Sequence, residues 1–275
     1  MKFIFRLFRA LPYHVLVCFF SIISILLYFI LTSRKKIGLK NIELALGVDR
    51  VKAKNILFKT YLYFAKMVAV NIKYLGNKKF IEKHFKIEGL ENFEEALANN
   101  RGVIFTTAHF GNFEMLVCGF AVLKQPINVM VRPLDNMALD RLVLNLRQSC
   151  GNNIVSSRLS TFEFLNMLKK NQILGILADQ YGGSKGLEVD FFGKKAKSSE
   201  GIAVLSYKNK TPILPAYLKE EGKTYKIVIK KPIYPKDEPF RQAVYTIMRS
   251  IYAEFEDWIK KEPTKYLWMH NRWKT

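Results

Sequence analysis

The sequence has 275 residues, 49% of them hydrophobic, and a formal net charge of +21 from 44 basic and 23 acidic side chains. This length provides for one medium-sized domain with ample core. The positive charge fits nucleic acid, an anionic membrane, an anionic lipid headgroup or an acidic protein partner. The hydrophobic content and the lack of a nucleic-acid-binding motif argue against nucleic acid, so no such partner is expected.

The N-terminal region has the composition of a membrane anchor. Residues 12–31 are almost wholly apolar and are about long enough to cross the hydrocarbon core of a bilayer. Basic residues flank both ends, so the positive-inside rule does not decide an orientation, and they would also suit a helix lying in the cytoplasmic leaflet. No small-residue cleavage site follows. We therefore predict a retained anchor over residues 1–40, either transmembrane or inserted in the membrane interface.

Residues 41–75 have the pattern of one or two helices, because apolar side chains recur at helical spacing and Asp49 can cap the start of a second helix. Lysines are interleaved with these apolar residues. They form either a solvated basic face or one used against a membrane or a carrier protein. A short strand at 85–88 and an acidic helix at 91–98 are predicted next.

From residue 102 onward, buried strands alternate with helices. Strands are predicted at 103–107, 127–131, 173–178, 212–218 and 225–231. Helices are predicted at 113–123, 137–149, 160–170, 200–208 and roughly 240–261. This alternation indicates an α/β fold with a mainly parallel central sheet flanked by helices. Ligand sites in such sheets lie at the carboxyl ends of the strands.

Polar residues follow the first of these strands. His109 stands at its end and Glu114 in the first turn of the next helix, with Gly111 between them for a sharp turn. An imidazole titrates near neutral pH, and a nearby carboxylate can fix its tautomer and stabilise its protonated form. Such a pair can take a proton from a hydroxyl. The alternative is a histidine that only caps a turn.

A nucleophile of the enzyme itself is not apparent, because no serine stands in a Gly-x-Ser-x-Gly motif. The substrate is therefore expected to supply the hydroxyl. The glycine-rich loop at 181–186 can bend closely around a ligand but lacks the Walker spacing. No metal or other cofactor is expected.

The three cysteines, Cys18, Cys118 and Cys150, have no metal-like spacing. Reduced thiols in a protein that faces the cytosol are the simplest prediction.

Several motifs together resemble one family. His109-Phe-Gly-Asn-Phe-Glu114 is similar to the His-x4-Asp/Glu motif of glycerolipid acyltransferases, and specifically to its form in the lipid A biosynthesis (lauroyl/myristoyl) acyltransferases. Further matches follow in the family's order and cover nearly the whole chain: Val131-Arg-Pro-Leu-Asp-Asn136, Ala178-Asp-Gln180, Phe191-Phe-Gly193 with Gly201, and Trp268-Met-His-Asn-Arg-Trp-Lys274. One such motif is weakly specific, whereas the ordered set is strongly specific.

The resemblance implies an acyltransferase domain over residues 41–275, attached to the bacterial inner membrane and facing the cytoplasm. The expected reaction transfers a fatty acyl chain from acyl carrier protein to a hydroxyl on a 3-hydroxyacyl chain of a lipid A precursor of the Kdo-lipid IVA type. No cofactor is implied. The expected partners are the acidic acyl carrier protein, the lipid A precursor and inner-membrane lipids. The lysine-rich surface suits both an acidic donor and a phosphorylated acceptor.

The resemblance also implies roles for individual residues. His109 would be the general base, and Glu114 would orient it and stabilise its charge. Arg147 matches the family's functional arginine, eleven residues after Asn136, and is a candidate for the oxyanion together with backbone N–H groups near Gly111. The remaining expected site residues are Arg132, for a phosphate or the oxyanion; Asp179, to align an arginine or His109; Gln180, for substrate; and Asn112 and Asn136, which fit turns better than chemistry.

Other assignments remain open at the level of sequence. Phe110, Phe113, Phe120 and Phe191 either line an acyl groove or form ordinary core, and His270 is expected to be structural or to bind a headgroup. The acceptor could be another glycolipid or a lysophospholipid, although the Phe-Pro-Glu-Gly motif of the lysophospholipid enzymes is not evident. A non-catalytic basic membrane-binding protein is a further alternative.

Overall fold

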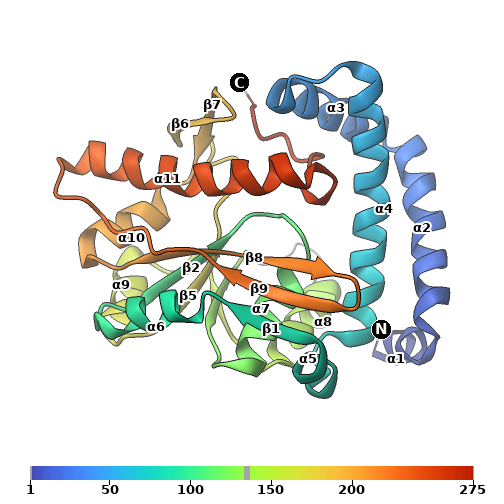
Figure 1. Ribbon diagram of the computed structural model, residues 1–275, viewed down its shortest axis with the longest axis horizontal. Coiled ribbons are helices and arrows are strands. Elements are labelled where there is room, and N and C mark those ends of the chain that lie inside the picture. The colour runs from blue at the N-terminus through green and yellow to red at the C-terminus, as the bar shows by residue number, and fades with distance from the viewer. Residues whose placement is uncertain (1, 133–136, 275) are drawn as a thin grey trace.

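The computed structural model describes residues 2–132 and 137–274, and a seven-stranded sheet forms its centre (Figure 1). In sheet order the strands are β1 (Phe85–Glu88), β9 (Thr224–Ile229), β8 (Ile213–Glu221), β2 (Val103–Thr107), β5 (Ile173–Leu177), β3 (Asn128–Val131) and β4 (Asn153–Ser156). Neighbouring strands are parallel except for the β8–β9 pair. The predicted α/β class with a mainly parallel sheet is confirmed.

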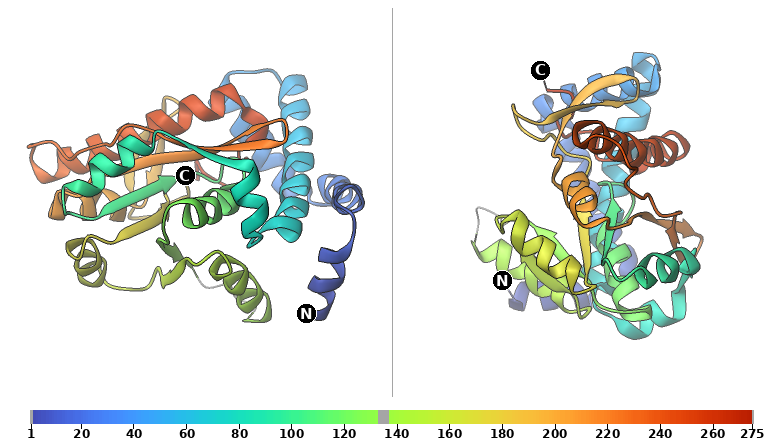
Figure 2. Two further views of the ribbon diagram at one scale, coloured as in Figure 1. Left: turned by 60° about the horizontal axis from the view of Figure 1, so that its bottom comes forward. Right: turned by 90° about the vertical axis from the view of Figure 1, so that its left-hand side faces the viewer.

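Helices cover both faces of this sheet, as the views in Figure 2 show. One face carries α9 (Thr161–Lys169), α10 (Gly201–Asn209) and α11 (Phe240–Lys261). The other carries α5 (Lys78–His84), α6 (Leu90–Ala98), α7 (Phe113–Leu123) and α8 (Met137–Gln148). Successive strand residues face opposite sides, so Ile104 belongs to the first core and Phe105 to the second. A strand covered on both faces reads as a continuous apolar run, which is why β2 was predictable.

Four N-terminal helices stand at one end of the sheet: α1 (Lys2–Ala10), α2 (Tyr13–Ile30), α3 (Thr32–Leu46) and α4 (Arg50–Tyr74). The Asp49 side chain accepts a hydrogen bond from the Lys52 N–H at 2.8 Å, which confirms the predicted cap. Helix α2 is long and apolar enough to cross a membrane. It lies along α4 (Figure 1), and the Ser24 hydroxyl donates to the Tyr61 carbonyl oxygen at 2.7 Å.

Two features of the sheet region were not predicted: strand β4 and the hairpin of β6 (Leu187–Phe191) and β7 (Lys194–Ser198). The hairpin sequence is rich in charge, so its alternation is easily missed, although Val189, Phe191 and Ala196 are buried. Phe192 and Gly193 connect the strands, both with positive φ (55° and 68°), as a two-residue type I′ turn requires.

The cysteine prediction is wrong for two of the three residues. Cys118 of α7 and Cys150, just after α8, form a disulfide with their Cα atoms 5.2 Å apart, whereas Cys18 is free on the exposed side of α2. The pairing depends on how α7 and α8 pack, and a separation of 32 residues gives no sign of it. The disulfide also removes the cysteine argument for a cytosolic location.

Candidate active site

His109 and Asp179 meet because β2 and β5 are parallel neighbours. Thr107 is aligned with Leu177, and each polar residue lies two positions beyond that pair, at the carboxyl edge of the sheet. The His109 Nδ1 atom is 2.8 Å from Asp179 Oδ1, and the Asp179 side chain is only 3% exposed. A buried carboxylate accepts a hydrogen bond from Nδ1–H, which leaves Nε2 as the proton acceptor of the ring.

The electrostatics of this pair favour an ionised Asp179 and a basic His109. Burial by itself lowers the pKa of His109, but the adjacent Asp179 carboxylate outweighs it and the pKa is raised above its ordinary value. Burial by itself raises the pKa of Asp179, but His109 and then Arg272 outweigh it and this pKa is lowered. The carboxylate therefore stabilises the imidazolium that forms when His109 takes a proton.

The Nε2 atom of His109 faces polar and aromatic neighbours. The Gln180 amide nitrogen lies 3.3 Å from Nε2, and the ring of Phe113 meets the imidazole edge to face at 5.2 Å between ring centres. The His109 side chain keeps 16% of its surface exposed, so a substrate group can reach it. Gln180, expected to bind substrate, therefore lies beside the proton-accepting nitrogen of His109.

The backbone around His109 is held by the C-terminal segment that follows η1 (Pro263–Lys265). The Leu267 N–H donates to the His109 carbonyl at 3.0 Å, and the Gly111 N–H donates to the Lys265 carbonyl at 2.9 Å. Gly111 has φ +61°, a conformation that glycine adopts without strain. Because its N–H is already used, Gly111 itself does not supply the expected backbone donor for an oxyanion.

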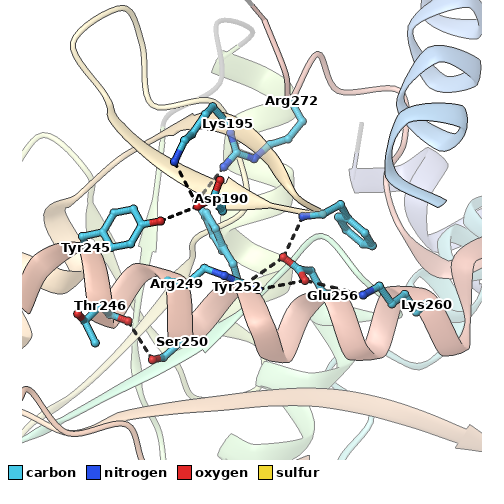
Figure 3. A network of polar contacts seen from close by, with 11 residues as sticks. Asp190, Lys195, Tyr245, Thr246, Arg249, Ser250, Tyr252, Glu256, Lys260 and Arg272 are labelled. Atoms are coloured by element: carbon cyan, nitrogen blue, oxygen red, sulfur yellow. Dashed lines mark hydrogen bonds and ion pairs between the residues drawn. The ribbon is translucent and has the colours of Figure 1, made fainter. Parts of the chain in front are cut away.

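The buried side chain of Arg272 is a second positive charge that lowers the pKa of Asp179. Arg272, 1% exposed, donates to the Ser198 hydroxyl and the Lys197 carbonyl, both at 2.7 Å, and to the Tyr252 hydroxyl at 2.9 Å. Figure 3 shows Arg272 extending towards Tyr252 on α11, above the ion pair of Arg249 and Glu256. The Tyr252 hydroxyl in turn donates to the Ala178 carbonyl at 3.1 Å, one residue before Asp179. Arg272 belongs to the matched motif at residues 268–274, but nothing in the motif spacing predicted this role.

Glu114 does not hold His109, contrary to the expectation. It forms a forked ion pair with Arg147 of α8, whose Nε lies 2.9 Å from one carboxylate oxygen and 3.1 Å from the other, and whose Nη2 contacts the same carboxylate. The first turn of α7 directs Glu114 towards α8, whereas His109 lies at the end of a strand whose register faces Asp179. Glu114 still raises the pKa of His109 through its charge, but less than Asp179 does.

A narrow, mainly apolar cavity adjoins the Glu114–Arg147 pair, between α7, α8 and the sheet. Its walls include Leu116, Val129, Met130 and Leu177. Of the four phenylalanines considered for an acyl groove, Phe113 lines this cavity, whereas Phe110, Phe120 and Phe191 are buried in the two cores.

The remaining predicted residues are placed as follows. Asn112 caps α7, its side-chain oxygen accepting from the Met115 N–H at 3.1 Å, which confirms it as a turn former. Arg132 is exposed just after β3. Asn136 lies outside the described residues. His270 accepts a hydrogen bond from the Tyr181 N–H at 3.1 Å, a structural contact that holds the start of the glycine-rich loop.

Comparison with known proteins decides the family. The family model for the bacterial lipid A biosynthesis acyltransferases matches residues 1–275. The chain belongs to this family. The membership agrees with the resemblance stated from the motifs.

Individual relatives are lipid A and glycolipid acyltransferases. The chain is 28% identical over 285 residues to the lipid A biosynthesis palmitoleoyltransferase of Escherichia coli K12, covering 96% of this chain and 87% of that protein. It is 25% identical over 199 residues to a lipid A biosynthesis acyltransferase of Haemophilus influenzae, covering 71% and 61%. It is 23% identical over 191 residues to a phosphatidylinositol mannoside acyltransferase of Mycobacterium tuberculosis H37Rv, covering 68% and 59%. The chain is therefore an O-acyltransferase that acts on lipid A or a related glycolipid.

Proposed function

We propose that this protein transfers a fatty acyl chain from acyl carrier protein to a hydroxyl of a lipid A precursor of the Kdo-lipid IVA type. The observation that carries the proposal is the His109 imidazole, bonded through Nδ1 to the buried Asp179 and presenting Nε2 to the site. Such a base can activate a hydroxyl that the substrate brings. Residues 1–40 serve in this proposal as the membrane anchor and residues 41–275 as the catalytic domain.

The proposed reaction begins at His109. His109 Nε2 takes the proton from the acceptor hydroxyl as its oxygen attacks the thioester carbonyl carbon. Asp179 stabilises the imidazolium through the 2.8 Å hydrogen bond. The tetrahedral oxyanion then collapses, the carbon–sulfur bond breaks, and the imidazolium returns its proton to the leaving thiolate. The products are the ester and the free thiol of the carrier.

Arg147 is the proposed source of positive charge for the oxyanion, and the Glu114 carboxylate fixes its guanidinium by the forked pair. Gln180 would position the acceptor hydroxyl at Nε2. Arg132, exposed after β3, would bind a phosphate of the acceptor.

The positive charge of the chain supports both the proposed acyl donor and the proposed membrane location. A net charge of +21 favours encounter with an acidic carrier protein and with anionic lipid. The basic residues on both sides of α2 suit the anionic cytoplasmic leaflet, so we propose the inner membrane with catalysis on its cytoplasmic side.

The decisive experiment incubates the purified protein with acyl carrier protein charged with a fatty acid and with Kdo-lipid IVA. Lipid mass spectrometry should show a product heavier by one acyl chain. Lipids from a deletion strain should lack the same chain. An unchanged acceptor spectrum in both measurements would refute this substrate assignment.

A second acceptor is favoured by one observation, the similarity to the Mycobacterium tuberculosis relative named for phosphatidylinositol mannoside. The same assay with that glycolipid decides between them. Preferential transfer to the mannoside would place this chain's function there, with the roles of His109 and Asp179 unaltered.

A further inference from the structure

A second apolar depression lies between α2, α4 and the C-terminal segment. We call it the α2–α4 groove. Its volume is about 450 Å³, within the range of small-molecule sites. Its lining includes Phe20, Leu27, Arg34, Val68, Leu267 and His270. This groove is separate from the cavity beside Glu114, because the two share no lining residue.

One wall of the groove belongs to the helix that meets the membrane. The side of α2 turned away from α4 exposes large apolar residues: Phe19, Ile22, Leu26, Phe29 and Ile30. Helix α2 is also the helix that is long and apolar enough to enter a bilayer. A lipid chain can therefore pass from the bilayer into the groove without crossing water.

The opposite wall is formed by the C-terminal segment, which contacts the backbone of the proposed base, His109. Leu267 lines the groove, and its N–H donates to the His109 carbonyl at 3.0 Å. His270, another lining residue, holds the Tyr181 N–H beside Gln180. The C-terminal segment around Leu267 therefore both lines the groove and contacts the backbone of the proposed base.

The polarity of the groove changes along α2. Phe20 and Leu31 are separated by eleven residues, a rise of roughly 16 Å along a helix. The Phe20 end is apolar, with Val68 across it on the antiparallel α4, whereas Arg34 lies just beyond Leu31. Arg34 is exposed and makes no ion pair with any of the described residues, so its charge is available to a phosphate.

We propose that the α2–α4 groove holds one acyl chain of the membrane-held acceptor lipid, with the phosphorylated headgroup at the Arg34 end. This proposal rests on the proposed function and names where its acceptor binds. A hydroxyl near the headgroup end of that chain would then lie on the side of the groove that borders His109.

Two neighbouring leucines of α2 provide a matched test. Leu27 lines the groove and is 40% exposed, whereas Leu26 does not line it and is 54% exposed. Leu27→Trp fills the groove, and Leu26→Trp makes the same chemical change on the outer face. The KM for Kdo-lipid IVA in detergent micelles should rise about tenfold in Leu27→Trp, since two buried methylene groups already change an equilibrium by that much. The KM for the acyl carrier protein donor and the KM values of Leu26→Trp should stay within about twofold of the wild type.

Photolabelling gives a readout that does not need catalysis. Anionic phospholipid vesicles would carry a phosphorylated glucosamine lipid with a diazirine in one acyl chain. Labels on groove-lining side chains of the wild type, lost in Leu27→Trp and retained in Leu26→Trp, support the proposal. The informative positions are Phe20, Ile23, Tyr61, Phe64 and Val68. Labels confined to the outer face of α2, or a rise in the KM of the donor alone, overturn it. Absence of acyl transfer by the wild type would refute the proposed function, while the label positions would still decide whether the groove binds this lipid.

Discussion

Two carboxylates lie near His109, and each pairs with a different basic side chain. Asp179 is buried at the end of β5 and bonds to the imidazole at 2.8 Å. Glu114 stands in the first turn of α7 and pairs with Arg147 across to α8. The closer residue in sequence is therefore not the one that holds the ring. Strand register brings Asp179 to His109, whereas the direction of a helix turns Glu114 away.

The two contacts are separate, although the His-x4-Glu spacing had suggested that Glu114 pairs with His109. In the proposed mechanism, Asp179 raises the basicity of His109. The other pair, Glu114 with Arg147, orients a cation beside an apolar cavity. Substitutions in the first pair should change the pH dependence of the reaction, and substitutions in the second should change its rate with less effect on that pH dependence.

The largest effect is expected for His109→Ala. Removal of a general base should lower kcat by about a thousandfold, within the range that such groups contribute. Acyl transfer followed by lipid mass spectrometry measures the loss, and sedimentation with membranes should show unchanged attachment. His84→Ala is a matched control, because His84 is on α5 and contacts the exposed Lys223 carbonyl. A fully active His109→Ala protein would end the assignment of the base.

Asp179→Asn should come next, with kcat lowered by about a hundredfold or more. The raised pKa of His109 in the wild type means that activity declines as the pH falls through a value above 6.5, where the imidazole becomes protonated. Without the carboxylate that pKa falls, so this decline should move to lower pH.

Profiles of kcat/KM against pH for the wild type, Asp179→Asn and the surface control Asp257→Asn measure this shift. Asp257 pairs with Lys261 on the outer side of α11. An unmoved profile in Asp179→Asn would show that Asp179 does not set the basicity of His109.

Glu114→Gln should lower the rate by about tenfold to a hundredfold, because a displaced Arg147 would misplace charge at the reacting carbonyl. Its pH profile should move less than that of Asp179→Asn, since Glu114 has the smaller influence on the pKa of His109. A cycle with Arg147→Gln tests the pairing, because two residues that act together give non-additive losses. Additive losses would show that the two side chains act independently.

The smallest effect on activity is expected for removal of the disulfide between Cys118 and Cys150. Cys118 lies one helical turn after Glu114, and Cys150 three residues after Arg147, so the disulfide and the ion pair join α7 to α8 side by side. Replacing both cysteines by alanine should lower Tm by about 5 to 10 °C, as loss of a native disulfide does in a chain of this size.

The transfer rate of this double variant should stay within a few-fold of the wild type, because the ion pair remains. Differential scanning calorimetry and the transfer assay measure the two quantities, with Cys18→Ala as the control. A rate loss as large as that of Glu114→Gln would show that the disulfide positions Arg147.

The strands and helices of the core were predictable where burial dictated the pattern. Strand β2 begins with three apolar residues and is buried along its whole length, because both of its faces are covered. The Asp49 cap marked the start of α4. The β6–β7 hairpin was missed, because Lys194, Lys195 and Lys197 conceal the alternation that buries Ala196. Strand β4 was missed because it has only four residues, of which Ile154 and Val155 alone are apolar. The pairing of Cys118 with Cys150 likewise depends on contacts between helices that spacing does not record.

The sequence by itself determined the family and the α/β class, and it singled out His109 as the candidate base, because ordered motifs and hydrophobic periodicity are local properties of the chain. Tertiary structure alone decided which acid serves His109, and it revealed Arg272 as the buried cation behind that acid. The physical reason is that Thr107 and Leu177 are seventy residues apart in the chain but adjacent in the sheet. Electrostatic interactions depend on that distance in space.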